Sequence, residues 1–539
     1  MTFIQLFRKE MHGSLPRLVF MAALGGISNA ALLAALNAGA QATGKSDKPS
    51  LWAAGLFLVS LFLFIKTQHY ILITATVEIE SIIHKLRVRL MDKLRQSELV
   101  PMERIGRGRI VGAITGDTAV LTQASTVVVF SVQSLVLVIL VGVYVAYLSI
   151  AAFLLSMAVV GGAGAIFHAQ GRRHAEGLRE ASEGSVKLFD RLTDFLDGFK
   201  EVRLNKLRSD NLYDDACEVS SNAAYIKIRT DAEGFKRMIF SQSAMYLVLA
   251  SVVFVAPNFG SMGEGSASKA ITSLLFVVGA CFGLVQTIPM LRAADGAADR
   301  ISQLETELSA TAQSVEISPD KLPKRFDKIE MSNIVFRHFD MASEALFKIG
   351  PIDFTLRSGD LVFITGGNGS GKSTFLKVLA GLYLPESGEI LLDGKRINDN
   401  TREEYRGLIT AIFTDYHLFR RLYGITDSDT ADVDRLLEKY RLSEKTRITN
   451  GEFQNIHLSG GQRKRLALIV ALLEKRPILL LDEWTSDQDP DFRRKFYHEI
   501  LPELNQTGAT IVVITHDDRY LNELDLPARR IHMEEGHFD

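Results

Sequence analysis

The chain has 539 residues, which is too long for one typical domain. Its 61 basic and 63 acidic residues give a formal net charge of −2, so overall charge does not indicate a nucleic-acid partner, and none is predicted. Apolar residues make up 47% of the chain and the mean hydropathy is +0.12, which is high for a soluble protein. Because the apolar excess lies N-terminally, the sequence predicts a membrane part followed by a soluble part.

Six stretches of the N-terminal part are apolar enough to be membrane spans, each of which needs about 20 residues. The predicted spans include residues 18–36, 51–65, 126–147, 148–167, 240–256 and 271–290. The third and fourth are nearly continuous, and we expect a short turn near Ser149 to split them into two helices. Lys66 follows the second stretch and is interpreted as a lysine that snorkels to the membrane surface, with a cargo contact as the alternative.

Lys and Arg are concentrated near the N-terminus and in two long segments, roughly residues 80–120 and 169–238. The positive-inside rule therefore predicts that the N-terminus, both segments and the C-terminal part lie in the cytoplasm. Spaced apolar residues and few prolines predict that both segments are helical extensions of the spans. Residues 104–109 and 198–205 contain Gly and Arg, which can pack into a groove, so we expect these tips to contact the C-terminal part; a solvated charged helical turn is the alternative.

A polar connection leads from the spans into the C-terminal part, which opens with an apolar strand pattern around residues 329–336. The predicted domains are a transmembrane domain with cytoplasmic helical extensions, a linker and an α/β domain. Their limits are residues 1–300, 301–325 and 326–539.

A phosphate-binding motif, G-x-x-x-x-G-K-[ST], directly follows the apolar run at residues 361–364. It comprises Gly366, Gly367, Asn368, Gly369, Ser370, Gly371, Lys372, Ser373 and Thr374. A strand that ends here and a helix that begins near Lys372 would turn backbone N–H groups and a positive helix end towards an anion. Lys372 is expected to reach the β- and γ-phosphates of a nucleotide, and Ser373 to hold Mg²⁺.

Further motifs follow in a fixed order. The first comprises Leu458, Ser459, Gly460, Gly461 and Gln462. A buried-strand pattern at residues 478–481 then ends in Asp482 and Glu483, and His516 follows the apolar run at 511–514. A lone loop or a lone histidine would be unremarkable, but this set in this order points to one nucleotide site.

This set of motifs resembles the nucleotide-binding domain of ABC transporters, and the resemblance covers roughly residues 320–539. The fold class it implies is multi-domain, with an all-α six-helix transmembrane domain followed by an α/β P-loop ATPase domain. ATP and Mg²⁺ are the implied cofactors. Asp482 would hold Mg²⁺, Glu483 would act as general base or orient the attacking water, and His516 and Lys372 would contact the phosphates.

In ABC transporters the signature loop binds the ATP held by the opposite subunit; in this chain the loop that resembles it is residues 458–462. The resemblance therefore implies a dimer with two ATP molecules between the subunits. Both half-sites of this chain are intact, which favours a homodimer over a heterodimer. For the aromatic platform under the adenine, His338 and Phe339 are equal candidates.

Departures from the common exporter pattern indicate which subgroup of ABC exporters the chain resembles. Thr414 stands where a Gln is usual, and Asp415 is an additional candidate for Mg²⁺ through a water. Several segments together resemble the bacterial group of cyclic-peptide and siderophore exporters, typified by the syringomycin- and pyoverdine-type exporters. They are residues 413–419, 462–468, 482–490, 492–497, 515–518 and, in the membrane half, 198–201.

The predicted function is ATP-driven export of a peptide-like or siderophore-like compound across the bacterial inner membrane, by alternating access in a homodimer surrounded by membrane lipids. One alternative is a lipid or lipid-linked precursor flippase with the same ATPase. Another is an ATP-gated regulatory membrane protein without transport. Import is disfavoured, because importers usually keep the membrane and ATPase parts on separate chains.

Overall fold

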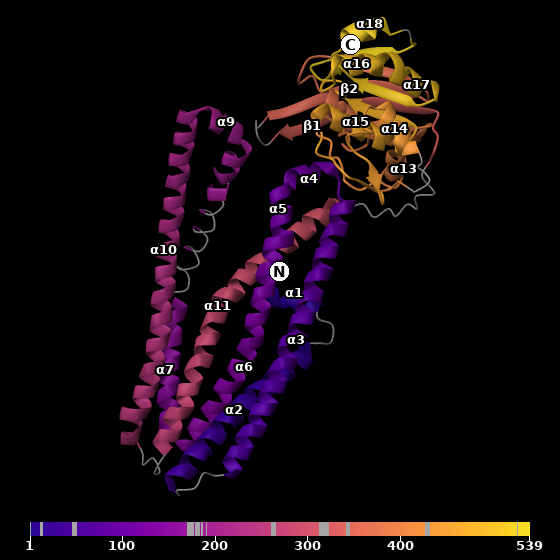
Figure 1. Ribbon diagram of the computed structural model, residues 1–539. Coiled ribbons are helices and arrows are strands. Elements are labelled where there is room, and N and C mark those ends of the chain that lie inside the picture. Colours follow the sequence, from indigo (N-terminus) through magenta and orange to yellow (C-terminus); the bar gives the residue numbers. More distant parts are fainter. Residues whose placement is uncertain are drawn as a thin grey trace. The chain divides into compact units, whose positions relative to one another are not determined.

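The computed structural model describes residues 2–10, 15–45, 51–169, 191–259, 266–311, 323–340, 345–425, 432–524 and 526–539, with a few helical residues between 177 and 189. Two compact units can be distinguished (Figure 1). The first comprises Met1–Met91 and Gly108–Thr306, and the second comprises Asp92–Arg107 and Glu307–Asp539. A short segment of the N-terminal half therefore belongs to the same unit as the C-terminal half.

The first unit is built from long apolar helices. Its principal helices are α1 (Phe3–Glu10), α2 (Leu15–Lys45), α3 (Leu51–Gln96), α5 (Arg107–Gly112), α6 (Thr118–Leu148), α7 (Ile150–Ala169), α9 (Phe199–Leu204), α10 (Lys206–Ala250) and α11 (Ser266–Thr311). Five described helices are long and apolar enough to cross a membrane, and the apolar part of α7, Ile150–Ile166, is shorter. The predicted turn is present, because Ser149 adopts an extended conformation between α6 and α7.

Close packing of small residues and shared apolar residues hold these helices together. A Cβ on Gly26 of α2 would lie 2.8 Å from Val136 of α6, so the glycine permits the close approach of the two helices. Leu33, Val141 and Leu274 belong to one buried cluster from α2, α6 and α11. Polar side chains meet across helices, as where Gln133 Nε2 donates to Gln68 Oε1 at 2.9 Å.

The second unit contains the predicted α/β domain and helix α4 (Leu99–Ile105). Its strands are β1 (Lys328–Asp340), β2 (Ala345–Arg357), β3 (Leu361–Thr365), β4 (Ser387–Leu392), β5 (Lys395–Arg396), β6 (Ile409–Ile412), β7 (Ile448–Thr449), β8 (Glu452–Phe453), β9 (Ile478–Asp482), β10 (Thr510–Ile514), β11 (Arg529–Glu534) and β12 (His537–Phe538). Its other helices are α12 (Lys372–Leu379), α13 (Arg402–Gly407), α14 (Val433–Lys439), α15 (Gly460–Leu473), α16 (Pro490–Lys495), α17 (Leu501–Gln506) and α18 (Asp518–Glu523).

A mainly parallel six-stranded sheet, in the order β12-β11-β3-β10-β9-β6, forms the centre of this domain. The side chains along β3 alternate between two hydrophobic cores: Val362 and Ile364 face one, and Leu361 and Phe363 face the other. Helix α12 and the antiparallel sheet β2-β1-β4-β5 pack on the first core, and α15 packs on the second. Burial on both faces explains why these strands read as continuous apolar runs.

The strand register brings the predicted motifs to one edge of the sheet. Ile514 of β10 pairs with Ile364 of β3 on one side and with Asp482 of β9 on the other. The three strands are parallel, so their carboxyl ends lie together, where ligands bind in open α/β sheets. The loops after β3, β9 and β10 therefore meet at this edge.

The domain limits 1–300, 301–325 and 326–539 stay a prediction. Helix α11 continues to Thr311, so the first part of the predicted linker is helical, and residues 312–322 lie outside the described part of the chain.

Candidate functional site

The predicted phosphate loop joins β3 to α12, and two of its glycines are required by close contacts. Gly366 has φ +143°, and a Cβ there would lie 2.1 Å from the carbonyl oxygen of Met533. Gly371 has φ +103°, and a Cβ there would lie 2.7 Å from the side chain of Ile349. Larger residues are therefore excluded at both positions. With glycine there, no side chain separates the loop backbone from a bound phosphate.

Lys372 begins α12 and is only 5% exposed. Its ammonium group donates to the carbonyl oxygens of Gly366 at 2.9 Å and Gly367 at 2.7 Å, so it lies across the loop. Burial lowers the pKa of Lys372, while the charges of Glu483 and Asp482 act in the opposite direction. The lysine is thus placed at the loop that would hold the phosphates.

Asp482, the last residue of β9, is 1% exposed, and its Oδ1 accepts a hydrogen bond from Ser373 Oγ at 3.1 Å. Burial raises the pKa of Asp482, the Ser373 hydrogen bond lowers it, and the neighbouring Glu483 charge raises it. Its other oxygen, Oδ2, is buried and has no hydrogen-bond partner among the described residues. A hydroxyl oxygen beside an unsatisfied carboxylate oxygen fits the oxygen ligands that Mg²⁺ prefers.

Glu483 follows Asp482 and points to the third strand of this edge. Its Oε1 lies 3.2 Å from Nε2 of His516, which follows β10. Its backbone is left-handed, with φ +47°, and its N–H donates to the carbonyl oxygen of Ile514 at 3.1 Å. The structure therefore brings Lys372, Ser373, Asp482, Glu483 and His516, which the sequence assigned to one site, to the same edge of the sheet.

The signature residues begin helix α15. Ser459 is the N-cap: its Oγ accepts from the Gln462 N–H, and the Gln462 side chain accepts from the Ser459 N–H at 3.2 Å. This reciprocal capping box explains both residue types locally, and it leaves the positive helix end exposed. Gly461 packs closely against the loop after β9. A Cβ at this position would lie 2.5 Å from the carbonyl oxygen of Asp487.

Two groups of predicted residues are less fully defined. The side chains of His338 and Phe339 lie outside the described residues; their backbones pair with Phe347 and Leu346 in the β1–β2 ladder. Thr414 and Asp415 are both exposed near Asp482, where the Thr414 amide lowers the pKa of Asp482 and the Asp415 charge raises it.

Within the second unit, α4 docks on the ATPase-like domain. The carboxylate of Glu98, just before α4, pairs with Arg402 at 3.4 Å and also with Arg406, both from α13. The Tyr383 hydroxyl donates to Glu103 at 2.8 Å, and burial, followed by this hydrogen bond, raises the pKa of Tyr383.

The sequence analysis predicted that this contact begins a few residues further along the chain than it does. It predicted a segment that starts at Arg104, whereas Leu99 and Val100 pack on the hydrophobic core and the polar contacts come from Glu98 and Glu103. The difference arises because the apolar residues that can be buried precede the Gly- and Arg-rich tip. Docking of the second predicted segment, at residues 198–205, stays a prediction; part of it forms α9.

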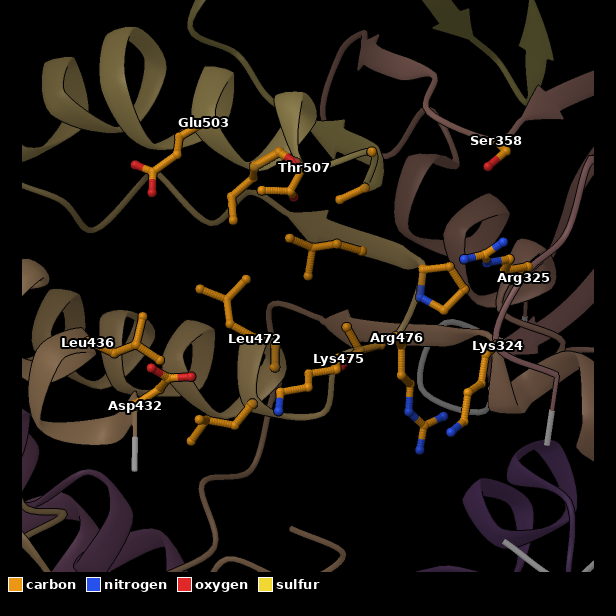
Figure 2. A pocket seen from close by; sticks show the side chains of 18 of the residues that line it. Lys324, Arg325, Ser358, Asp432, Leu436, Leu472, Lys475, Arg476, Glu503 and Thr507 are labelled. Carbon is orange, nitrogen blue, oxygen red and sulfur yellow. Dashed lines mark hydrogen bonds between the residues drawn. The ribbon is translucent and has the colours of Figure 1, made fainter. Parts of the chain in front are cut away.

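A groove of 770 Å³ lies elsewhere on the same domain (Figure 2). Leu472, Lys475 and Thr507 line it, next to the amino ends of the parallel strands. None of the predicted nucleotide-binding or signature residues lines this groove. It is therefore separate from the candidate nucleotide site.

Sequence reasoning missed two residues, one beside the site and one at the contact with α4. Lys464 is buried in α15 and contacts the loop after Glu483, and Tyr383 connects to α4. The signal for Lys464 was a lysine on a helix face that is otherwise apolar. No sequence pattern pointed to Tyr383.

Comparisons with known proteins agree with this geometry. The sequence model of the ABC transporter family matches residues 349–486. The ATP-binding protein SyrD of Pseudomonas syringae pv. syringae is 34% identical over 95% of this chain and 92% of its own length. The probable syringafactin export ATP-binding/permease protein SyfD of the same pathovar is 32% identical over 38% of this chain and 32% of its own. A solved structure of a bacterial Atm1-family ABC exporter with ATP bound covers 99% of this chain and 94% of its own, with a TM-score of 0.77 and 17% identity.

The chain belongs to the ABC transporter family. It is a multi-pass membrane protein with an exporter-type fold, in which ATP binding and hydrolysis are coupled to transport. The family resemblance and the fold class predicted from the motifs are thereby confirmed.

Proposed function

We propose that this exporter moves a peptide-like or siderophore-like compound out of the cytoplasm across the bacterial inner membrane, and that it works as a homodimer. The observation that carries the proposal is the meeting of Lys372, Ser373, Asp482 and Glu483 at one sheet edge, in a chain that also holds a membrane unit. The similarity to a protein named for syringafactin export supports a peptide-like cargo.

Each side chain at the edge has a proposed part in ATP hydrolysis. Glu483 takes a proton from water, whose oxygen forms a bond to the γ-phosphorus while the bond to the bridging oxygen of ADP breaks. Lys372 and the N–H groups of the phosphate loop neutralise charge on the phosphates. His516, which contacts Glu483, is proposed to donate to the γ-phosphate.

Mg²⁺ would be held by Ser373 and Asp482, with Asp415 as a further candidate through water. When bound, the ion would supply positive charge that neutralises the phosphates. The geometry at Asp482 agrees with this assignment, because its buried Oδ2 has no hydrogen-bond partner among the described residues and its Oδ1 lies beside Ser373 Oγ.

The dimer is proposed because one chain holds one phosphate loop and one signature loop. The exposed start of α15, at Ser459, Gly460 and Gly461, would bind the γ-phosphate of ATP on the partner subunit. ATP then binds the closed dimer better than the open one, which is the difference that allows it to drive a conformational change.

Helix α4 is proposed to pass this change to the membrane unit. It is continuous in sequence with α3 and α5. It is fixed to the ATPase by the ion pair of Glu98 with α13 and by the hydrogen bond that Glu103 accepts from Tyr383. Closure of two ATPases would therefore displace the ends of the membrane helices and open the cargo path outward by alternating access.

The test is ATP-dependent uptake of labelled cyclic peptides and peptide siderophores into inside-out membrane vesicles. Glu483→Gln provides the inactive blank, because removal of a general base lowers turnover by about 100-fold or more. Glu503→Gln is the matched control, since Glu503 pairs with Lys439 at 2.5 Å beside the distant groove.

Uptake by the wild type and by Glu503→Gln, but not by Glu483→Gln, would support the proposal and identify the cargo class. Full ATPase activity in Glu483→Gln would contradict the assigned role of this residue. ATPase activity stimulated by lipid alone, without peptide uptake, would instead indicate a lipid flippase.

A further inference from the structure

The side chain of Lys464 connects two parts of the site that the proposed function assigns to different ATP molecules. Lys464 lies in the second turn of α15, the helix that begins with the signature loop, and it is 5% exposed. Its Nζ donates to the carbonyl oxygen of Glu483 at 2.9 Å and to Ser486 Oγ at 2.8 Å. It also pairs with Asp487 Oδ2 at 2.8 Å. All three partners lie on the loop that follows β9.

The contact with Glu483 holds a backbone that is costly to maintain. A non-glycine residue at φ +47° is uncommon and persists only where its surroundings fix it. The Glu483 N–H is held by Ile514 at 3.1 Å, and its carbonyl oxygen is held by Lys464 and by Ser486 Oγ at 2.8 Å. These bonds set the direction in which the Glu483 carboxylate leaves the backbone.

Further hydrogen bonds and an ion pair connect the same loop to the start of α15. The indole of Trp484 donates to the carbonyl oxygen of Lys464 at 2.9 Å, and the Gln488 side chain donates to the carbonyl oxygen of Gly461 at 3.1 Å. Arg465 donates to Gln488 at 2.8 Å and pairs with Asp489. The signature helix and the loop after Glu483 therefore form one packed block.

We propose that Lys464 is a positioning residue that fixes Glu483 relative to the signature loop of the same subunit. This inference rests on the proposed function, in which Glu483 acts on the ATP of its own subunit and Ser459 binds the ATP of the partner. Lys464 then ties the geometry of one ATP site to occupancy of the other. Replacement of Lys464 should therefore weaken the coupling between the two sites, because the block would no longer move as a unit.

A positive charge suits this position for a physical reason. A buried ammonium group is stable only when it is paired, and Lys464 has one carboxylate and two further oxygens as acceptors. Methionine has a similar length but would leave the Glu483 carbonyl with one donor fewer. The carboxylate would then lose its fixed orientation while the phosphate loop stays unchanged.

The experiment compares Lys464→Met with wild type in full-length protein reconstituted in lipid nanodiscs. We expect kcat for ATP hydrolysis to fall about tenfold or more, because small displacements of a catalytic group have large effects on rate. Binding of trinitrophenyl-ATP should change by less than about threefold, and the Hill coefficient for ATP should fall towards one. Lys464→Arg, which keeps the charge, should recover part of both kcat and cooperativity.

Lys439→Met is the matched control, because Lys439 also lies on a helix and pairs with an acid but lines the distant groove. It should leave kcat and the Hill coefficient unchanged. If Lys464→Met does not fold, as judged by gel filtration and circular dichroism, Asp487→Asn decides the question. It removes the ion pair without changing the shape of the side chain, and a smaller loss of kcat and cooperativity is expected.

The inference is overturned if a folded Lys464→Met protein, or folded Asp487→Asn in its place, keeps kcat within about twofold and keeps its cooperativity. It is also overturned if kcat and trinitrophenyl-ATP binding fall together by the same factor. Glu483→Gln, assayed in parallel, separates this outcome from failure of the proposed function. Loss of activity in Glu483→Gln with a normal Lys464→Met protein contradicts only the role of Lys464.

Discussion

The two units of this protein use polar side chains in different ways. In the ATPase unit they gather at the carboxyl ends of three parallel strands, where Lys372, Asp482 and Glu483 each have defined contacts. In the helical unit many Ser and Thr hydroxyls donate to a carbonyl oxygen of their own helix, as Ser125 does to Leu121, and pairs between helices, such as Gln133 with Gln68, are isolated. Chemistry therefore depends on single side chains in the ATPase unit, whereas the helical unit depends on distributed packing. Substitutions in the first should have large, specific effects, and those in the second should have small ones.

The largest effect is expected for Lys372→Ala. The substitution removes the ammonium group that lies across the phosphate loop, so ATPase activity should fall about 100-fold and ATP binding should weaken. Turnover and trinitrophenyl-ATP binding of the purified protein are the measurements. Lys395→Ala, on the exposed strand β5, is the control. Near-normal turnover in Lys372→Ala would disprove the assignment of the phosphate loop.

A smaller and different effect is expected for Glu98→Ala. The change leaves the buried guanidinium of Arg402 without one of its two carboxylate partners and loosens α4, which should cost about 2–3 kcal/mol of stability. Transport per ATP hydrolysed should fall several-fold, because α4 would move less with the ATPase. The ratio of uptake to hydrolysis in vesicles measures this effect. Glu80→Ala, at an exposed position of α3, is the control, and an unchanged ratio in Glu98→Ala would rule out coupling through this contact.

Two neighbouring glycines give a sharper test of packing within the ATPase unit. A Cβ on Gly461 would lie 2.5 Å from the carbonyl oxygen of Asp487, whereas a Cβ on Gly460 would make its nearest contact at 3.9 Å. Gly461→Ala should therefore destabilise the nucleotide-free protein by about 1–3 kcal/mol, and Gly460→Ala should not. Thermal unfolding in the absence of ATP compares them. Equal melting temperatures for the two variants would show that the loop after Glu483 does not press on the signature turn.

The smallest effect is expected in the helical unit, for Lys66→Leu. The side chain is exposed, and its Nζ lies 5.7 Å from the centre of the Phe62 ring, so it extends along its own helix. We interpret Lys66 as a lysine that snorkels to the membrane surface. Transport rate and cargo choice should stay nearly unchanged in the vesicle assay. An altered cargo profile would instead identify Lys66 as a cargo contact and would weaken the contrast between the two units.

Sequence patterns were sufficient where a local rule fixes the structure. The turn at Ser149, the order of apolar helices and the strand–loop–helix at residues 361–379 follow from hydropathy and from glycine-rich loop chemistry. The motif order also identified the family, because phosphate binding restricts which residues can occupy such a loop.

Contacts between distant residues were not predictable in the same way. The contact of α4 with the ATPase begins at Glu98 because Glu98 pairs with Arg402 and Arg406, which lie about 300 residues further along the chain. Lys464 lies on an otherwise apolar face of its helix, but only the folded chain shows that its ammonium group holds the carbonyl oxygen of Glu483.

The sequence by itself thus determined the family, the class of each unit and the candidate residues for a nucleotide site, because these depend on short-range patterns of glycine, charge and apolar periodicity. The tertiary structure decided which side chains hold those residues in place. The reason is physical: the strand register brings Asp482, Ile514 and Ile364 side by side, and packing of α15 on the loop after β9 sets the direction of Glu483.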